Sequence, residues 1–249
     1  MTGDSTRTPP TLSAAEHVRA AAGGPPHRVT LELPFRRPFN PDNLFGHLAA
    51  TAVPGVEEVR AGAYRRTLRL AHGPGIAELT PGDDEVACRL ILAHPGDLGA
   101  AIDRCRWLLD LDADPSAIDG RLARDPVLAP LVTGAPGRRI PRTVNGPELA
   151  IRAVLGQQIS TAAARTLGAR LTIEFGEPIV DPDGGLTHLF PTPASLREAR
   201  LAGPASRGRT LTALASALAS GDLMADPGAG VAQARAVLVQ GPKIGRAHV

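Results

Sequence analysis

The sequence predicts an α+β protein in which a small antiparallel sheet domain with two helices is followed by an all-α domain. Stretches with the alternating apolar and polar residues of half-buried strands are confined to the part before residue 93. Helical spacing of apolar residues dominates after residue 112. The 249 residues are 43% hydrophobic and 21% charged, a balance that can bury a core and excludes disordered, collagenous and fibrous proteins. This length fits one large domain or two small ones, and the change of pattern favours two.

Residues 27–112 are expected to form the sheet domain, after a flexible leader at residues 1–26. The leader is rich in Thr, Ala, Pro and Gly and ends in the breaker Gly-Gly-Pro-Pro. A first strand over residues 29–33 is followed by a helix with Asp42 as its expected N-cap, and a Pro-Gly pair ends this helix. Four further strands and a second helix are expected at residues 56–59, 63–70, 75–79, 85–92 and 97–111.

Residues 113–242 are expected to be all-helical, because strand signals vanish there and short helical pieces are joined by Asp-Pro and Gly-Pro breaks. Asn145 predicts one helix start, since its side chain can cap the first turn and a Pro follows within that turn. Ser160 predicts the start of the next helix. Two more helical patterns cover residues 209–219 and 231–239.

Charge and cysteine content narrow the functional classes. Residues 1–135 hold 14 basic and 17 acidic side chains, whereas residues 136–249 hold 13 basic and 8 acidic ones, so the second half is the expected face for a polyanion. Cys88 and Cys105 are expected to be reduced, packed thiols without a metal, since they show neither CxxC spacing nor clustered His residues. No run approaches the ~18 apolar residues of a membrane span and no export signal opens the chain, so we expect a cytoplasmic protein.

The most unusual local feature is the junction at residues 156–160, where an apolar helix breaks into Gly-Gln-Gln-Ile-Ser and a new helix starts at once. Gly156 permits close approach of a partner, and the amides of Gln157 and Gln158 can both donate and accept hydrogen bonds. Free N–H groups at the start of the second helix suit an anion such as phosphate. These residues alone leave two interpretations open, a ligand-binding turn or merely a capped turn between helices. The sequence contains no GxGxxG, HExxH or GxSxG motif that would indicate a common enzyme class.

Residues 151–160 resemble the signature of the 3-methyladenine-DNA glycosylase II family, within the helix-hairpin-helix DNA glycosylase superfamily. The likeness covers about residues 28–240 and consists of segments that follow one another in the family's order. These segments are residues 29–33, 44–57, 63–68, 108–112, 140–141, 152–157 and 190–193. The resemblance implies a TATA-binding-protein-like sheet domain followed by a helix-hairpin-helix glycosylase domain.

By this resemblance the protein is a base-excision repair enzyme that flips an alkylated purine of the 3-methyladenine type out of double-stranded DNA and hydrolyses its N-glycosidic bond. Gln158 takes the position of the family's wedge, which is usually aliphatic, and a Gln can fill the vacated stack and hydrogen-bond the orphaned base. His47 stands where the family has an aromatic residue of the substrate pocket, with Phe45 nearby. The expected DNA contacts are Gln157, Gln158, Ser160 and Arg165.

The family's phosphate-binding hairpin and the Asp that stabilises its transition state should follow the helical pattern at residues 231–239. No residue of this chain matches them, so no catalytic residue is named and the chain is expected to be an inactive fragment. Residues 243–249 are expected to be a non-native tail, because residues 244–249 correspond to a translated sequencing adapter.

Two alternatives to this function stay open. A non-catalytic DNA-binding module would keep the wedge surface without the chemistry, and an oxidised-purine glycosylase of the same superfamily would carry a lysine nucleophile. No cofactor and no membrane association are expected. The partner is expected to be double-stranded DNA with damaged bases, bound by a monomer at the bacterial nucleoid.

Overall fold

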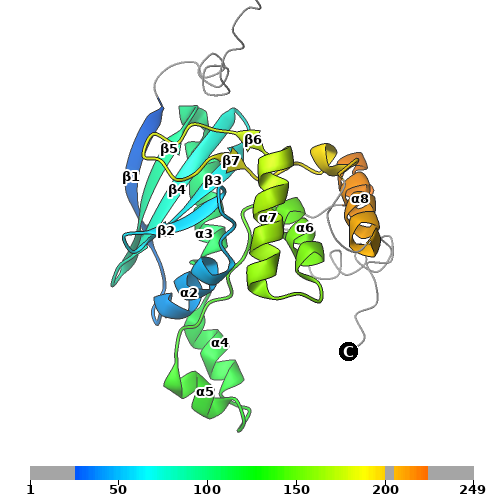
Figure 1. Ribbon diagram of the computed structural model, residues 1–249. Helices are drawn as coiled ribbons and strands as arrows, with labels where there is room; N and C mark the ends of the chain where they lie inside the picture. Colours follow the sequence, from blue (N-terminus) through cyan, green and yellow to red (C-terminus); the bar gives the residue numbers. More distant parts are fainter. Residues whose placement is uncertain (1–25, 200–204, 224–249) are drawn as a thin grey trace, which may run out of the picture.

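The structure, a computed structural model, describes residues 26–199 and 205–223 (Figure 1). A five-stranded antiparallel sheet with the strand order β1-β5-β4-β3-β2 forms one part, and helices that follow residue 145 form the other. This arrangement confirms the predicted α+β class. The strands of the sheet are β1 (His27–Pro34), β2 (Glu57–Arg60), β3 (Ala63–Leu70), β4 (Gly73–Pro81) and β5 (Glu85–Leu92).

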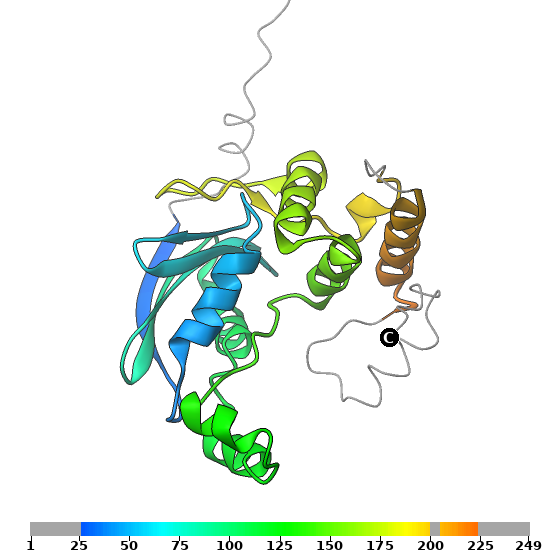
Figure 2. The same ribbon diagram turned by 60° about the horizontal axis from the view of Figure 1, so that its bottom comes forward.

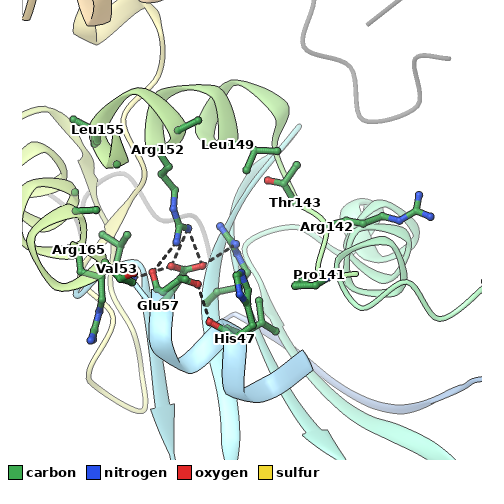
Figure 3. Close-up of a pocket in the computed structure, with 18 of the residues that line it drawn as sticks. His47, Val53, Glu57, Pro141, Arg142, Thr143, Leu149, Arg152, Leu155 and Arg165 are labelled. Atoms are coloured by element: carbon green, nitrogen blue, oxygen red, sulfur yellow. Dashed lines mark hydrogen bonds and ion pairs between the residues drawn. The ribbon is translucent and has the colours of Figure 1, made fainter. Parts of the chain in front are cut away.

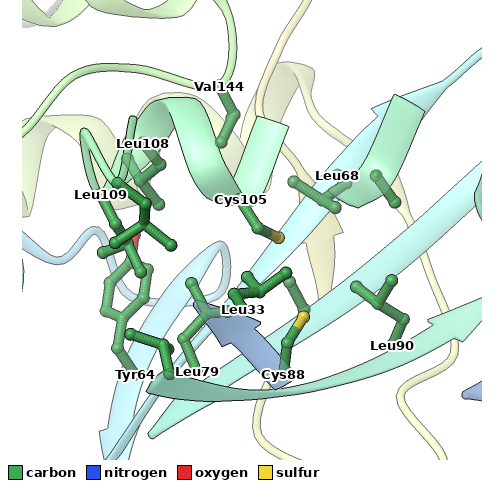
Figure 4. Close-up of a cluster of buried hydrophobic side chains, with 14 of the residues drawn as sticks. Leu33, Tyr64, Leu68, Leu79, Cys88, Leu90, Cys105, Leu108, Leu109 and Val144 are labelled. Carbon is green, nitrogen blue, oxygen red and sulfur yellow. The ribbon is translucent and has the colours of Figure 1, made fainter. Parts of the chain in front are cut away.

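Strand alternation places every second side chain of the sheet against two helices. These helices are α2 (Pro41–Thr51) and α3 (Leu98–Leu108), the latter preceded by the 3₁₀ turn η1 (Pro95–Asp97). On β3, Tyr64 and Leu68 belong to this buried cluster, which Figure 4 shows between the strands and α3. Cys88 and Cys105 lie in the same cluster, and both are buried and free, as the sequence predicts. The sheet part therefore has a hydrophobic core of its own.

Helix α2 differs from its prediction at its start. The N-cap is Asn40, whose Oδ1 accepts a hydrogen bond from the Asn43 backbone N–H at 3.1 Å. The expectation that Asp42 caps this helix is therefore wrong. The physical reason is Pro41, because a proline fits the first helical position best and so moves the cap to the residue before it. Asp42 lies in the first turn, where its negative charge still favours the positive end of the helix dipole.

The helices after residue 112 form two groups. A short helical hairpin projects beyond the sheet, as Figure 2 shows, and a larger group packs beside the sheet. The hairpin consists of α4 (Pro115–Leu122) and α5 (Ala129–Gly134), and the larger group contains α6 (Gly146–Gly156), α7 (Thr161–Phe175), the 3₁₀ turn η2 (Ala194–Leu196) and α8 (Ala205–Ser220). In the described part of the chain, no helix has the length and hydrophobicity to cross a membrane.

A second buried cluster holds the larger helical group together. Its members come from α6, α7 and α8, from η2 and the residues beside it, from the residue Leu223 after α8, and from the connection between α2 and β2. They include Val53, Val56, Ile151, Leu155, Leu171, Leu211 and Leu214. Because Val53 and Val56 belong to the chain of the sheet part, this core joins the two parts. The predicted leader up to residue 25, the predicted helix at residues 231–239 and the predicted tail at residues 243–249 lie outside the described residues.

The expectation that the second half is all-helical is wrong for residues 177–189. The two-residue strands β6 (Glu177–Pro178) and β7 (His188–Leu189) pair antiparallel, and the segment between them extends over the sheet (Figure 1). Leu186 of this segment packs with Ile76 and Ile91, which point away from α2 and α3. Such short strands carry no alternation that a sequence could display, so tertiary contacts alone define them.

A buried arginine fixes the same segment by charge. The side chain of Arg65 is 1% exposed, and its Nη2 lies 3.0 Å from Oδ1 of Asp181, which is equally buried. The Nη1 of Arg65 also donates to the Gly184 carbonyl oxygen at 2.9 Å. The segment that covers the outer face of the sheet is therefore held by the ion pair and hydrogen bond of Arg65 as well as by apolar packing.

Candidate functional site

A cavity of about 320 Å³ opens where the sheet part and the helical part meet. Side chains from α2, α6, α7 and the connection before α6 line it, as Figure 3 shows. His47 of α2 lies on one side, and Arg152 of α6 and Arg165 of α7 lie on the other. Crevices between two structural units are common ligand sites, because each unit contributes a wall of different chemistry.

Four charged side chains form a connected network of ion pairs, which we call the ionic quartet, and all of them except Glu148 line this cavity. They are Glu57, Arg66, Glu148 and Arg152. Arg66 of β3 donates from Nη2 to Oε2 of Glu148 at 2.9 Å and from Nη1 to Oε1 of Glu57 at 3.2 Å. Arg152 of α6 donates from Nη1 to Oε2 of Glu57 at 3.0 Å and to Oε1 of Glu148 at 3.0 Å. The quartet is electrically balanced and binds α6 to the sheet part.

The electrostatics of the quartet follow from its burial. Glu57 and Arg66 have side chains only 3% exposed. Burial would raise the pKa of Glu57, but the guanidinium groups of Arg66 and Arg152 outweigh it and hold this pKa below its ordinary value, helped by hydrogen bonds from Tyr64 and the Val53 backbone. Glu57 is therefore an anion throughout the physiological pH range.

Glu57 has no capacity left for catalysis. Besides the two arginines, the Tyr64 hydroxyl donates to its Oε1 at 2.6 Å, and the Val53 backbone N–H donates to its Oε2 at 2.8 Å. It is the only carboxylate among the described residues that line the cavity. These residues thus offer no free carboxyl group for acid–base work or for stabilising a positive charge on a substrate.

The turn between α6 and α7 lies beside the cavity and has an unusual backbone. Gln158 adopts φ +59°, the left-handed region that side chains other than Gly rarely occupy. Gln157 is the C-cap of α6, and Ser160 caps α7 by accepting a hydrogen bond on Oγ from the Ala163 N–H at 3.2 Å. The side chains of Gln157, Gln158 and Ser160 are exposed, whereas Ile159 is half-buried and lines the cavity. Gln158 is thus the outward point of a capped, strained turn.

The structure brings most of the candidate residues to one region but not all. His47 is exposed and lines the cavity. Phe45 does not, because it is half-buried against the core of the sheet part. Arg165 is half-buried at the cavity, and its Nε donates to the Ala52 carbonyl oxygen at 2.7 Å.

Sequence reasoning missed the ionic quartet. Two of its pairs join residues far apart in the chain, since Arg66 and Glu148 are separated by 82 positions and Glu57 and Arg152 by 95. The sequence holds only local signals of these ion pairs. Arg66 is a charge inside a strand pattern, which demands a partner when buried, and Glu148 precedes Arg152 by one helical turn.

Comparison with solved structures defines the class of fold. The chain superposes with a TM-score of 0.64 on "3-methyladenine dna-glycosylase from Archaeoglobus fulgidus", at 17% identity, covering 74% of this chain and 66% of that one. The apo form of Clostridium acetobutylicum 8-oxoguanine glycosylase/lyase gives a TM-score of 0.59 at 16% identity, covering 82% of this chain and 69% of that one. The fold is therefore that of DNA glycosylases.

Comparison with curated sequences defines the family. Residues 30–145 match the family model of the AlkA N-terminal domain. The chain is 33% identical over 223 residues to "DNA-3-methyladenine glycosylase 2" of Escherichia coli, covering 86% of this chain and 76% of that protein. It therefore belongs to the 3-methyladenine-DNA glycosylase II family, which confirms the resemblance found in the sequence.

One relative is longer than this chain. The "Probable bifunctional transcriptional activator/DNA repair enzyme AlkA" of Mycobacterium tuberculosis is 52% identical over 233 residues, which cover 92% of this chain and 46% of that protein. The chain thus spans about half the length of this relative.

Proposed function

We propose that the chain is part of a base-excision repair glycosylase that acts as a monomer on double-stranded DNA of the bacterial nucleoid. In this proposal it flips an alkylated purine out of the helix and hydrolyses the N-glycosidic bond. The observation that carries the proposal is the exposed Gln158, which lies at the tip of a capped turn beside the cavity of about 320 Å³. Membership of the glycosylase II family supports the substrate class.

Gln158 acts as the wedge in this proposal. Flipping a nucleotide costs a few kcal/mol of lost stacking and pairing, and a side chain that fills the gap lowers this cost. The Gln158 amide can also donate to and accept from the orphaned base, which an aliphatic wedge cannot do. Gln157 and Ser160 flank the wedge, and the N-terminal end of α7 offers partial positive charge to a DNA phosphate.

His47 forms the substrate side of the cavity in this proposal. Its imidazole can stack on an extruded purine while neutral, and a protonated ring would repel a base that is itself cationic. Phe45 contributes indirectly, because it packs α2 against the core of the sheet part and so supports the helix that carries His47.

A second candidate function is a non-catalytic DNA-binding module, and one observation favours it for this chain. The transition state of glycosidic hydrolysis carries positive charge on the sugar, which an enzyme stabilises with a preorganised anion. Among the described residues that line the cavity, the only anion is Glu57, and the quartet engages it fully. The full chain is therefore expected to bind damaged DNA without releasing bases.

Two measurements test these proposals. Fluorescence anisotropy compares the affinity of the chain for an intact duplex, a duplex with an abasic-site analogue and a duplex with an alkylated purine, and we expect tighter binding to the last two. Equal affinity for all three duplexes would contradict the flipping function. Base release from the alkylated duplex above the level of a mock purification would instead refute the non-catalytic module.

A further inference from the structure

The C-terminal end of α2 receives charged side chains from α6 and α7, the two helices that flank the turn at residues 157–160. Arg152 of α6 donates from Nη2 to the Thr51 carbonyl oxygen at 2.7 Å, and Arg165 of α7 donates from Nε to the Ala52 carbonyl oxygen at 2.7 Å. Carbonyl oxygens at the end of a helix carry partial negative charge and attract cations. Helices α6 and α7 are thus hydrogen-bonded to two adjacent residues at the end of α2, Thr51 and Ala52.

Close packing reinforces this attachment. A Cβ added at Gly168 of α7 would lie 3.2 Å from Cγ2 of Val53, the residue directly after Ala52. Gly168 is buried, so α7 approaches the end of α2 more closely than a larger residue would permit. Arg165 and Gly168 are three positions apart and therefore share one face of α7, which is the face that meets α2.

The turn itself is held from its other side by a third arginine. Arg207 of α8 donates from Nη2 to the Gln157 carbonyl oxygen at 2.9 Å. The turn is thus bonded to α8 through its own carbonyl group, and the helices on either side of it are bonded to carbonyl groups at the end of α2. The side chains of Gln157 and Gln158 stay exposed. In the described part of the chain, no carboxylate lies within ion-pairing distance of Arg165, so the Ala52 carbonyl is its defined partner.

We infer that Arg165 is a positioning residue, and that it fixes the 157–158 turn relative to α2 instead of serving as a phosphate contact. This inference rests on the proposed function. By joining α7 to the end of α2, Arg165 keeps Gln158, the proposed wedge, at a fixed distance from His47, the proposed contact of the extruded base. A bond through Nε orients the whole guanidinium plane, which a lysine cannot reproduce. The role is therefore specific to arginine rather than to positive charge.

The first test needs no DNA. Hydrogen–deuterium exchange is measured on the full chain for the wild type, Arg165→Lys, Arg165→Gln and the control Arg170→Gln, which removes an exposed charge from the same helix. Both Arg165 variants should exchange about tenfold faster at residues 51–57 and 156–164, with β3 unchanged. The control should match the wild type. Unchanged exchange at residues 156–164, or equal acceleration in β3, would overturn the inference.

The second test separates positioning from phosphate binding. Affinity for a duplex with an abasic-site analogue is measured from 50 to 200 mM NaCl for the same proteins. Both Arg165 variants should bind about tenfold more weakly with the salt slope of the wild type. A phosphate contact would give a different result. Arg165→Lys would then bind with the affinity of the wild type, and Arg165→Gln would lower the slope of log affinity against log salt concentration by about 0.9. If the wild type shows no preference for the abasic duplex, the proposed function fails, whereas the exchange result still decides the role of Arg165.

Discussion

Glu57 accepts hydrogen bonds from Tyr64 and Arg66 of β3 and from Arg152 of α6, so a single carboxylate connects both parts of the molecule. Buried ion pairs add little net stability compared with apolar packing, but losing one partner leaves the others buried without compensation. The residues of the quartet are therefore important for holding α6 against the sheet rather than for chemistry.

Glu57→Gln should lower the free energy of unfolding by about 3–5 kcal/mol, because two arginines would then share one carboxylate in a buried site. Urea denaturation measures this change. The matched control is Glu32→Gln on β1, where the side chain is exposed, and its effect should stay within about 0.5 kcal/mol. Similar effects of the two substitutions would contradict the buried role of Glu57.

Acid should destabilise the protein partly through Glu57. Its pKa lies below the ordinary value of 4.5 in the folded chain, so the unfolded chain binds a proton more readily. The stability from this group is complete above the unfolded pKa and is lost as the pH falls through the lower folded value. Between about pH 5 and about pH 3, wild-type stability should fall more steeply than that of Glu57→Gln. If the free energies of unfolding of the wild type and of Glu57→Gln changed in parallel with pH, Glu57 would have the same pKa in the folded and unfolded chain, which would contradict this prediction.

Several residues could be assigned from the sequence because their roles are local. The N-caps Asn145 and Ser160 each bond an N–H three residues ahead, so a short window contains the whole interaction. At α2 the sequence offers Asp42 as a capping residue, but Pro41 takes the first helical position and the N-cap is Asn40. Within the quartet, the pair of Glu148 and Arg152 is one helical turn apart and could be predicted, whereas the pairs Arg66–Glu148 and Glu57–Arg152 could not, because 82 and 95 positions separate their members.

The elements were predictable where their pattern is long. The strands β3 and β5 have the bounds that alternation predicts, and α8 ends at Ser220, directly before Gly221, whose φ of +83° suits the end of a helix. The pair β6 and β7 was not predictable, because two residues cannot show a period. Their position depends on contacts such as Leu186 with Ile76 across the sheet.

The helical hairpin of α4 and α5 should contribute little to global stability. Val127 is 73% exposed and Leu131 is 66% exposed, so Val127→Asn and Leu131→Gln should change the free energy of unfolding by less than about 0.5 kcal/mol each. Leu211 of α8 is fully buried, and Leu211→Ala should cost about 2–5 kcal/mol. Chemical denaturation compares the three variants, and a large loss in either hairpin variant would mean that this surface is covered in solution.

The whole molecule brings a cavity, a protruding turn and a helix N-terminus to one side of the junction between sheet and helices. Val53 and Val56 place the end of α2 inside the helical core, and the quartet adds a charged connection. The proposed function depends on such a junction, because in that proposal Gln158 must enter DNA at a fixed distance from the cavity that receives the base.

The most direct test of this function is the affinity of Gln158→Ala for a duplex with an abasic-site analogue and for an intact duplex, measured over a range of salt concentrations. The variant should lose about tenfold in affinity for the abasic duplex while its salt slope stays that of the wild type, because the slope counts phosphate contacts. The control Glu174→Ala, an exposed change at the far end of α7, should retain the wild-type preference. Unchanged abasic-site affinity of Gln158→Ala would contradict the wedge role and make Ile159 the candidate.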